Sequence, residues 1–397
     1  MSDLFLHQFH TGIRVANTFI KFFLTDTNKG SSTGVLMHMN ILRSFFTDDL
    51  AIDLGTVNTL VYAPGRGIVL NEPSVVAIHK YTGEVLATGA EAFKLLGREP
   101  RDTEVHRPIR GGTIEDFEVT EKMLAAFINR VHEGHQKRSH LVIGVPGSST
   151  ALEQRSVRDA AHDAKATRVD LVDEGLAAAL GAGLDFDEER AHLIVDIGGG
   201  TTNIAIIASA AVISSVSLRA AGTIMDEAIR DYVRAKYTMQ IGERTAEEVK
   251  KELGTARAPQ PDEAYQERFM EVVGKDLADG SAKAVEIGSL EVCEALEPVI
   301  AEIIAGVRRV IEESQPDVTA DIYHTGIILT GGGALLDGIG ERLQRELRLH
   351  VAVAEEPLAS VALGAGRLLA HPEKLQRVSI RQDVPAWQAS EELIVNW

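Results

Sequence analysis

The stretch "LAIDLGTVNTLVYAPGRGIVL", residues 50–70, decides the fold. It predicts an apolar strand, a tight Gly-Thr turn and a second β-rich strand, followed by a third. An acidic residue, Asp53, interrupts the first strand just before the turn. A carboxylate inside an apolar strand is costly unless something compensates its charge, so we expect Asp53 to serve a ligand or an ion.

The same pattern occurs a second time in "LIVDIGGGTTNIAIIASAAVISSV" (193–216), where Asp196 takes the position of Asp53. Two further pairs of segments follow in the same order. A strand, a small-residue loop and a helix are predicted by "LVIGVPGSSTALEQRSVRDAA" (141–161) and by "GIILTGGGALLDGIGERLQREL" (326–347). A strand, an acidic pair and a helix rich in small residues are predicted by "VDLVDEGLAAALGAG" (169–183) and by "VAVAEEPLASVALGAG" (351–366).

Three matching pieces in one order predict two related α/β domains, each with a mixed sheet flanked by helices. Two similar domains that face each other form a cleft, and ligands favour such clefts. Each domain is expected to carry a small inserted subdomain, at about 67–110 and about 242–290. The expected boundaries are 1–46 for an N-terminal extension, 47–187 and 188–372 for the two domains, and 373–397 for a C-terminal tail.

The composition is that of an ordinary soluble globular protein, with 45% apolar and 25% charged residues in a chain of 397. The net charge of −18 argues against a nucleic-acid partner and against purely electrostatic docking to anionic lipid. The one cysteine, Cys293, can form no internal disulfide, which fits a reducing compartment. No apolar run reaches membrane-spanning length.

The turns "GTVNT" (55–59) and "GGGTT" (198–202) are expected to face the cleft from opposite sides. Glycines let the backbone approach an anion and present its amides, and threonine hydroxyls add donors. We therefore expect the two loops to grip a polyphosphate. Asp53 and Asp196 are expected to hold Mg²⁺ through water molecules. The alternative is a pair of hairpin turns, each with a capping aspartate, and the duplication disfavours it.

A third glycine loop, "LTGGGALL" (329–336), opens a predicted helix. Its backbone is expected to pack against a nucleoside or a phosphate, and a tight strand–helix turn is the alternative. The segment "RTAEEVKKELG" (244–254) predicts a helix that starts with a capping box of Thr245 and Glu248 and has Gly254 past its end. A solvated charged face is the plainer interpretation of that helix.

Glu174 is the candidate for activating water. It follows a predicted strand, precedes an apolar helix and lies beside the expected cleft, where a carboxylate can orient or deprotonate a water that attacks a γ-phosphate. The alternative is an acid favoured by the helix dipole, and the matching Glu356 keeps that alternative open.

A second capping box is predicted from Thr150 and Glu153. No Walker-A pattern, metal-spaced His/Cys cluster or G-x-S-x-G elbow occurs.

Taken together, these features resemble the superfamily of actins, sugar kinases and heat-shock chaperones. Within it, the chain is similar to the bacterial actin family MreB, whose members determine rod shape. The resemblance covers roughly residues 39–378. Its stretches are "DLGTVNTLVY", "GIVLNEPSVVAI", "VIGVP", "VDIGGGTTNIAII", "MDEAIRDYVR", "IGERTAEEVKKELG", "GIILTGGGALL" and "AEEPLASVALGAG". It implies two actin-like (ribonuclease-H-like) domains around a nucleotide cleft.

The resemblance also implies an ATPase that binds ATP and Mg²⁺ and assembles into filaments of itself. The filaments would lie in the cytoplasm at the inner face of the cytoplasmic membrane and guide the cell-wall elongation machinery. Glu174 matches the water-activating position and Asp196 a residue needed for metal and hydrolysis. The residues implied on the phosphate loops are Gly55, Thr56, Val57 and Asn58 on the first and Gly198, Gly199, Gly200 and Thr201 on the second. Those implied near ribose, base and adenosine are Glu247, Glu248, Val249, Lys250, Gly331, Gly332, Gly333 and Ala334.

The chain departs from the family in three places. The family's Pro-Met after the catalytic glutamate is Gly175-Leu176 here, which puts the hydrolysis rate in question. The loop that often carries an apolar membrane-contacting pair is "HEGHQKRSH" (132–140), without an apolar side chain. "MNILRSFF" (39–46) is then the candidate anchor, through an amphipathic helix, and a strap packed on the domain is the alternative. Residues 1–38 are either untranslated, with Met39 as the start, or an additional anchor.

Two other functions belong to the same superfamily. A small-molecule kinase of the sugar type would need a catalytic aspartate and a sugar pocket, and the sequence indicates neither. A chaperone-type ATPase would need a substrate-binding domain after residue 371, where only a short segment follows. The filament-forming ATPase therefore remains the favoured interpretation.

Overall fold

The computed structural model describes residues 49–132, 139–257 and 266–380. All of them belong to one compact unit, Asp48–Trp397, while a second unit covers Met1–Thr47. The candidate anchor at 39–46, most of the loop 132–140 and most of the C-terminal tail thus lie outside the described residues. Among the residues described, no helix is long and apolar enough to cross a membrane.

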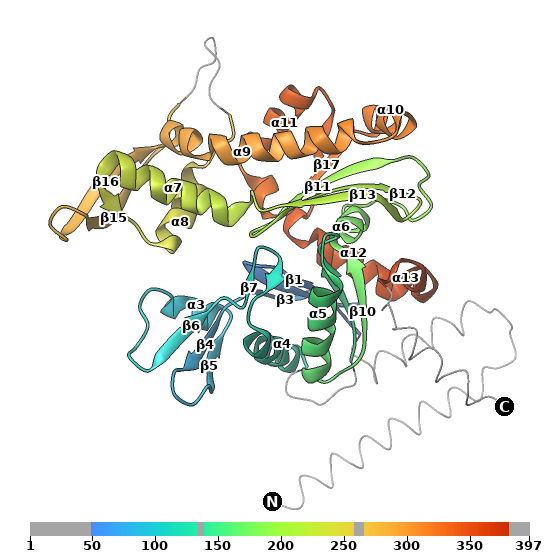
Figure 1. Ribbon diagram of the computed structural model, residues 1–397, viewed down its shortest axis with the longest axis horizontal. Helices are drawn as coiled ribbons and strands as arrows, with labels where there is room; N and C mark the ends of the chain where they lie inside the picture. The colour runs from blue at the N-terminus through green and yellow to red at the C-terminus, as the bar shows by residue number, and fades with distance from the viewer. Residues whose placement is uncertain (1–48, 133–138, 258–265, 381–397) are drawn as a thin grey trace, which may run out of the picture. The chain divides into compact units, whose positions relative to one another are not determined.

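The first half of the described chain is built on a five-stranded sheet with the order β10-β9-β1-β2-β3 (Figure 1). β1 pairs antiparallel with β2 and parallel with β9. Every residue of β1 is buried except Asp53, which is partly exposed. The strands are β1 Leu50–Leu54, β2 Asn58–Ala63, β3 Gly67–Pro73, β9 Ser139–Val145 and β10 Ala166–Asp173.

The second half repeats this sheet strand for strand, in the order β13-β12-β11-β17-β18. β11 pairs antiparallel with β12 and parallel with β17, so it takes the place of β1. The duplication predicted from the sequence is therefore confirmed. The strands are β11 His192–Ile197, β12 Thr202–Ala208, β13 Ala211–Leu218, β17 Ile327–Thr330 and β18 Val351–Val353.

Two helices rich in small residues join the halves. α6 (Glu174–Gly181) follows the first sheet but contacts β11 and β12, whereas α12 (Ser360–Ala370) follows the second sheet and contacts β1 and β9. The helices cross closely: a Cβ on Gly364 would overlap the Ala177 carbonyl, and one on Gly181 would overlap the Ser360 carbonyl. The small residues are therefore needed for this contact, and Figure 1 shows the two helices side by side.

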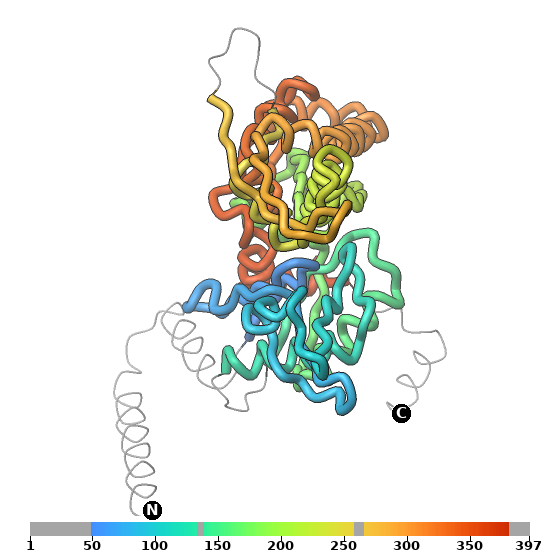
Figure 2. The backbone as a smooth tube through the Cα atoms, turned by 90° about the vertical axis from the view of Figure 1, so that its left-hand side faces the viewer, coloured from blue at the N-terminus to red at the C-terminus, as the bar shows by residue number. Residues whose placement is uncertain are grey.

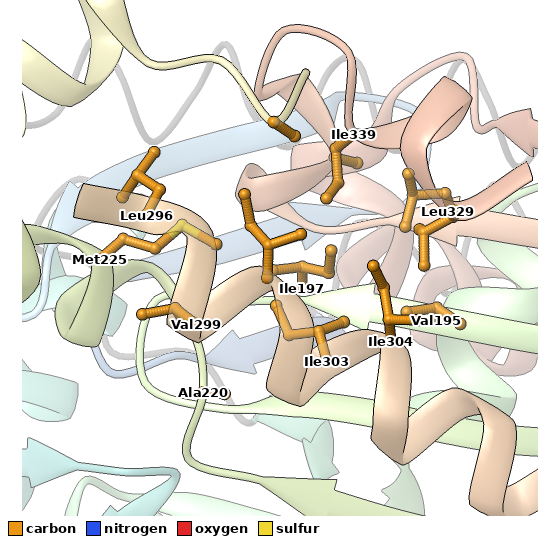
Figure 3. Close-up of a cluster of buried hydrophobic side chains, with 14 of the residues drawn as sticks. Val195, Ile197, Ala220, Met225, Leu296, Val299, Ile303, Ile304, Leu329 and Ile339 are labelled. Carbon is orange, nitrogen blue, oxygen red and sulfur yellow. The ribbon is translucent and has the colours of Figure 1, made fainter. Parts of the chain in front are cut away.

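Longer helices cover the outer faces of the sheets. In the second half, the helix α9 (Ser289–Glu312) packs Ile303 and Ile304 beside Ile197 and Val195 of the sheet, while its Leu296 and Val299 lie by Met225 (Figure 3). The helices are α4 Phe117–Val131 and α5 Ala151–Asp163 in the first half, and α7 Gly222–Tyr237, α9 Ser289–Glu312, α10 Pro316–Thr325, α11 Ile339–Leu347 and α13 Pro372–Val378 later in the chain. Two 3₁₀ helices are η1 Gly332–Leu335 and η2 Pro357–Ala359.

Each half also carries a small three-stranded sheet, β5-β4-β6 and β14-β15-β16, and both face the viewer in Figure 2. β3 falls in the expected insert of about 67–110, yet it is a strand of the large sheet. The elements are β4 Val76–His79, β5 Val85–Thr88, α3 Ala90–Leu95 and β6 Thr103–His106, then β7 Ile109–Arg110 and β8 Thr113–Ile114, and β14 Met239–Gln240, α8 Glu243–Leu253, β15 Phe269–Asp276 and β16 Ala282–Gly288.

Of the two predicted capping boxes, the structure confirms one and contradicts the other. Thr150 and Glu153 form one at the start of α5, with Thr150 N donating to Glu153 Oε2 over 2.7 Å. The box of Thr245 and Glu248 is wrong, because α8 already begins at Glu243. The preceding β14 pairs with β15, and this long-range pairing sets where the chain turns into the helix. Gly254 caps the end of α8, as predicted.

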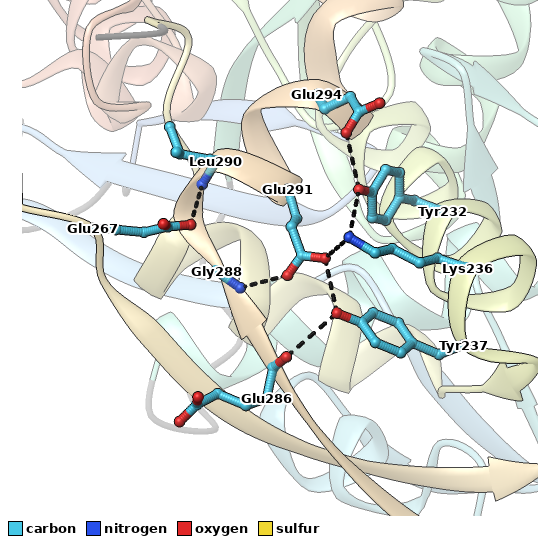
Figure 4. A network of polar contacts seen from close by, with 9 residues as sticks. All are labelled: Tyr232, Lys236, Tyr237, Glu267, Glu286, Gly288, Leu290, Glu291 and Glu294. Carbon is cyan, nitrogen blue, oxygen red and sulfur yellow. Dashed lines mark hydrogen bonds and ion pairs between the residues drawn. The ribbon is translucent and has the colours of Figure 1, made fainter.

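A polar network ties the end of α7 to the start of α9 (Figure 4). Lys236 and the Tyr237 hydroxyl both donate to Glu291, which in turn accepts from the Gly288 amide over 2.8 Å. The Tyr232 hydroxyl donates to Glu294 over 2.9 Å. These contacts hold α7 in place, and the opposite end of α7 supports the second glycine loop.

Candidate functional site

The first glycine loop connects β1 to β2 and is braced by a buried serine. Ser74 Oγ donates to the Gly55 carbonyl over 2.6 Å, and the Ser74 amide donates to the Val57 carbonyl over 2.8 Å. Thr59 bonds the same hydroxyl over 2.9 Å. The loop carbonyls therefore point into the protein. Ser74 was not predicted as a site residue, although it lies in one of the stretches that carry the resemblance.

The second glycine loop connects β11 to β12 and rests on the start of α7. The Thr223 amide and hydroxyl both donate to the Gly199 carbonyl, over 2.7 and 2.8 Å. The Gly222 amide donates to the Gly198 carbonyl over 3.1 Å. Because α7 occupies these carbonyls, the loop amides face the other way, toward the first loop.

The two glycine loops, which were expected to face a cleft from opposite sides, contact each other directly. A Cβ on Gly199 would overlap the Val57 side chain, and one on Gly200 would overlap the Thr56 hydroxyl. Within the described chain, no hydrogen bond engages the amides of Thr56, Val57, Gly199 and Gly200. Unpaired amides on facing glycine loops form an anion-binding concavity.

A turn of the first half, at Gly112, contacts both glycine loops. The Gly112 amide donates to Thr56 Oγ1 over 3.0 Å. A Cβ on Gly112 would lie only 3.1 Å from Thr201 Cγ2. Gly112 has a φ of 76°, in the left-handed region that favours glycine. The turn that contains Gly112 therefore touches both phosphate-loop candidates, a role that the sequence did not indicate.

Asp53 and Asp196 occupy equivalent positions in the two sheets and repel each other. Desolvation by burial, together with the charge of Asp196, raises the pKa of Asp53 to about 7. Burial raises the pKa of Asp196 to about 6, although the Thr330 hydroxyl donates to it over 3.1 Å and favours the charged form. A nearby cation would relieve this repulsion.

The pair fits Mg²⁺ held mainly through water. Mg²⁺ prefers oxygen ligands and commonly keeps several waters while binding one or two carboxylates. In the described residues there is no group of three or more acidic, histidine or cysteine side chains that could enclose a metal ion. The carboxylates of Asp53 and Asp196 thus suit an outer contact with a hydrated ion rather than a protein cage.

Glu174 begins α6 and is buried beside these aspartates. Burial raises the pKa of Glu174 well above its ordinary value, and the charges of Asp53, Asp196 and Asp173 raise it further. Asn203 opposes this shift, because its Nδ2 donates to Glu174 Oε2 over 2.7 Å. Asn203 directly follows the second loop and was not predicted as a site residue.

A cavity of about 20 Å³ adjoins Glu174. This volume is enough for one water molecule. Gly112, Gly144 and Pro146 form part of its wall, so the cavity lies between the first sheet and the turn that contacts Thr56. Glu174 therefore adjoins a cavity large enough to hold one water molecule.

The third glycine loop packs against the end of β11. Gly331 has a φ of 82°, and a Cβ there would overlap Asp196 Oδ1 and the Ile197 carbonyl. A Cβ on Gly333 would overlap the Ile197 side chain. These glycines thus allow close packing beside Asp196, and the helix that they open is the 3₁₀ helix η1. Gly332 is exposed, and Ala334 is buried.

The predicted base-side residues of α8 differ in their surroundings. Lys250 Nζ donates to the Gly222 carbonyl over 2.8 Å and pairs with Asp226 Oδ1 over 2.8 Å. Burial raises the pKa of Asp226 to about 6, and Lys250 opposes the shift. Val249 is fully buried in the core, so its side chain cannot face a ligand. Glu247 pairs with Lys251; Glu248 is exposed.

Three features define an actin-like protein. They are the duplicated sheets, the facing glycine loops, and the helices α6 and α12, each of which contacts the sheet of the other half. A solved structure with this fold, MreB5 of Spiroplasma citri bound to ADP, superposes with a TM-score of 0.78 at 32% identity, over 83% of this chain and 98% of that one. The double helical filament of MamK gives a TM-score of 0.68 at 23% identity, over 82% of this chain and 99% of that one, and supports the fold alone.

The sequence relatives identify the family. The profile described as MreB/Mbl protein matches residues 47–377. The chain is 41% identical to the cell shape-determining protein Mbl of Bacillus subtilis, over 84% of this chain and 98% of the relative. It is 44% identical to the cell shape-determining protein MreB of Escherichia coli, over 82% and 94%. The chain belongs to the MreB/Mbl family.

Proposed function

We infer that this protein is an ATP-hydrolysing cytoskeletal protein that helps to determine cell shape. The observation that carries this inference is the meeting of two glycine loops, one from each half, beside the carboxylates of Asp53, Glu174 and Asp196. The loops supply backbone amides for a polyphosphate, and the carboxylates supply sites for a cation and a base. A solved relative bound to ADP supports a nucleotide as the ligand.

The two glycine loops and the three carboxylates have distinct roles in this proposal. The amides of Thr56, Val57, Gly199 and Gly200 hold the phosphates from both sides, and the hydroxyl of Thr201 adds a donor. Asp53 and Asp196 orient a hydrated Mg²⁺, which supplies positive charge to the phosphates when bound. Glu174 accepts a proton from the water that attacks the terminal phosphate. A raised pKa brings Glu174 closer to the pH at which a general base is most effective.

The proposal extends to assembly and location. Family members named cell shape-determining proteins support a role in rod shape, and we propose that this chain polymerises into filaments of itself. The filaments would lie in the cytoplasm against the inner face of the membrane and act with the cell-wall elongation machinery. The membrane contact is assigned to residues 39–46. Phe45→Ala/Phe46→Ala should then reduce co-pelleting with lipid vesicles, and unchanged pelleting would exclude this anchor.

Electron microscopy of the full chain on a lipid monolayer tests the main proposal. The parent and Glu174→Ala are compared with ATP and without nucleotide, and phosphate release is measured in parallel. We expect ATP-dependent filaments that persist longer in the variant. Particles that stay monomeric while ATP is consumed would contradict the cytoskeletal role and favour a small-molecule kinase. An absence of nucleotide binding would contradict both.

A further inference from the structure

The first turn of α8 contacts two residues of the first half, Phe93 of α3 and Arg107, which directly follows β6. Arg107 NH2 pairs with Glu243 Oε1 over 2.6 Å. The ring of Phe93, on α3, has guanidinium groups from both halves near it: Arg107 Cζ lies 5.7 Å and Arg244 Cζ 5.5 Å from its centroid. Cations at such distances are attracted to an aromatic ring. We call these four residues the cleft contact.

The cleft contact joins elements that are far apart in the sequence. Phe93 and Arg107 belong to the small-sheet region of the first half, and Glu243 and Arg244 start the helix beside the small sheet of the second half. Both regions lie on the same side of the protein (Figure 2). Among the ion pairs found in the described ranges, Arg107–Glu243 is the one that connects these two regions.

The pair is largely buried at its arginine and exposed at its glutamate. The side chain of Arg107 is 16% exposed and that of Glu243 39%. A partly desolvated pair gains more from its Coulomb attraction than a solvated one, but it also loses hydration, so the net stabilisation stays modest. A contact of this kind can open and close at little cost, as a gate requires.

Both sides of the contact lead to the phosphate loops. On the first side, the chain runs from Arg107 to Gly112, whose amide bonds Thr56 of the first loop. On the second side, α8 continues to Lys250, which bonds the Gly222 carbonyl. The Gly222 amide in turn bonds the Gly198 carbonyl of the second loop. The cleft contact is therefore connected to both loops, by the intervening chain on the first side and by α8 with two hydrogen bonds on the second.

We propose that Arg107, Glu243, Phe93 and Arg244 form a latch that holds the two halves closed over bound nucleotide and sets the rate of its release. The inference rests on the proposed nucleotide binding. The four residues act as positioning residues, because they hold the halves and do not touch the phosphates. Opening the latch would widen the cleft beside α8 and let the nucleotide leave.

Charge reversal tests the latch. Arg107→Glu, Glu243→Arg and the double variant are compared with the parent by the dissociation rate of a fluorescent ATP analogue in stopped flow. We expect each single variant to release the analogue about tenfold faster, which corresponds to about 1.4 kcal/mol. The double variant should restore most of the parent's rate, because the pair is rebuilt with its charges exchanged. Phe93→Ala should also accelerate release.

Lys94→Glu is the matched control. Lys94 Nζ pairs with Glu91 over 2.6 Å, the same distance, but both residues lie in α3 and the pair joins no second element. This variant should release the analogue at the parent's rate. Thermal unfolding of every variant shows whether a faster release merely reflects lost stability, and the small-angle scattering radius without nucleotide should increase in the two single variants.

The outcomes separate this inference from the proposed function. Tight binding by the parent with unchanged release in both single variants would overturn the latch alone. Accelerated release that the double variant does not restore would also overturn it, because a structural defect would then explain the singles. If the parent binds no analogue, the proposed function and the latch both fail.

Discussion

Asn203 of the second half donates a hydrogen bond from Nδ2 to Oε2 of Glu174 of the first half, over 2.7 Å. Both side chains are buried. The bond joins β12 to the start of α6 and stabilises the charged form of a carboxylate whose surroundings otherwise favour the neutral form. The charge state of the proposed base therefore depends on how the two halves meet.

Replacement of this amide should change the pH dependence of hydrolysis. Asn203→Ala removes a bond that lowers the pKa of Glu174, so the acidic limb of the rate profile should shift to higher pH. Asn203→Asp should shift it further, because it adds a negative charge. Phosphate release measured across pH checks both. The exposed Asn71→Ala should leave the profile unchanged, and an unshifted profile in both Asn203 variants would contradict the role of the bond.

Glu174→Gln should separate binding from hydrolysis. The amide keeps the size of the side chain but cannot accept the proton, so ATP turnover should fall by about 10²-fold or more while nucleotide affinity is retained. The matched control is Glu356→Gln, which changes the equivalent acidic position of the second half. Steady-state phosphate release and equilibrium binding distinguish the two. A Glu174→Gln enzyme with the parent's turnover would exclude this residue as the base.

Asp53 should make the empty protein less stable as pH rises. Its pKa in the folded protein is about 7, whereas an unfolded aspartate titrates near 3.8. Between these values the folded state binds more protons, so stability decreases with rising pH across this window and the loss is complete above it. Asp53→Asn removes this loss. Relative to the parent, the variant should gain on the order of 1 to 2 kcal/mol between pH 4 and pH 8, after allowance for its partial exposure.

Urea unfolding at several pH values measures this gain. Asp159→Asn, at an exposed surface position, should show no such trend. Mg²⁺ should raise the stability of the parent more than that of Asp53→Asn, because the added cation relieves the same repulsion. If the difference in the free energy of unfolding between Asp53→Asn and the parent stayed constant across pH, the pKa of Asp53 would not be raised in the folded protein.

The crossing of α6 and α12 should tolerate no added methyl group. Gly364→Ala would place a Cβ against the Ala177 carbonyl, and we expect a loss of about 1 to 3 kcal/mol in the free energy of unfolding. Gly340→Ala, in α11, is the control, since its Cβ would meet only side-chain atoms at 3.9 Å. Alanine has the higher helix propensity, so this control should be neutral or stabilising. Thermal and urea unfolding compare the two, and equal effects would contradict the tight crossing.

Much of the fold was predictable because it is encoded by local patterns. An apolar strand with an aspartate before a turn of glycine and threonine indicated the hairpin that begins each half, and the repetition of this pattern indicated two equivalent sheets. The capping box of Thr150 and Glu153 was predictable for the same reason, since both partners lie within one helical turn. The box of Thr245 and Glu248 was not, because α8 begins three residues earlier, directly after the pairing of β14 with β15.

The sequence by itself determined the duplicated strands, the glycine loops and the acidic residues at their ends, because these depend on neighbours a few positions apart. Only the tertiary structure decided which of these residues meet. Ser74 braces the first loop from 19 positions away, and Asn203 reaches Glu174 across 29. Arg107 finds Glu243 from the opposite half. Such contacts arise when the two cores pack and bring distant side chains together, and no local pattern in the sequence records that distance.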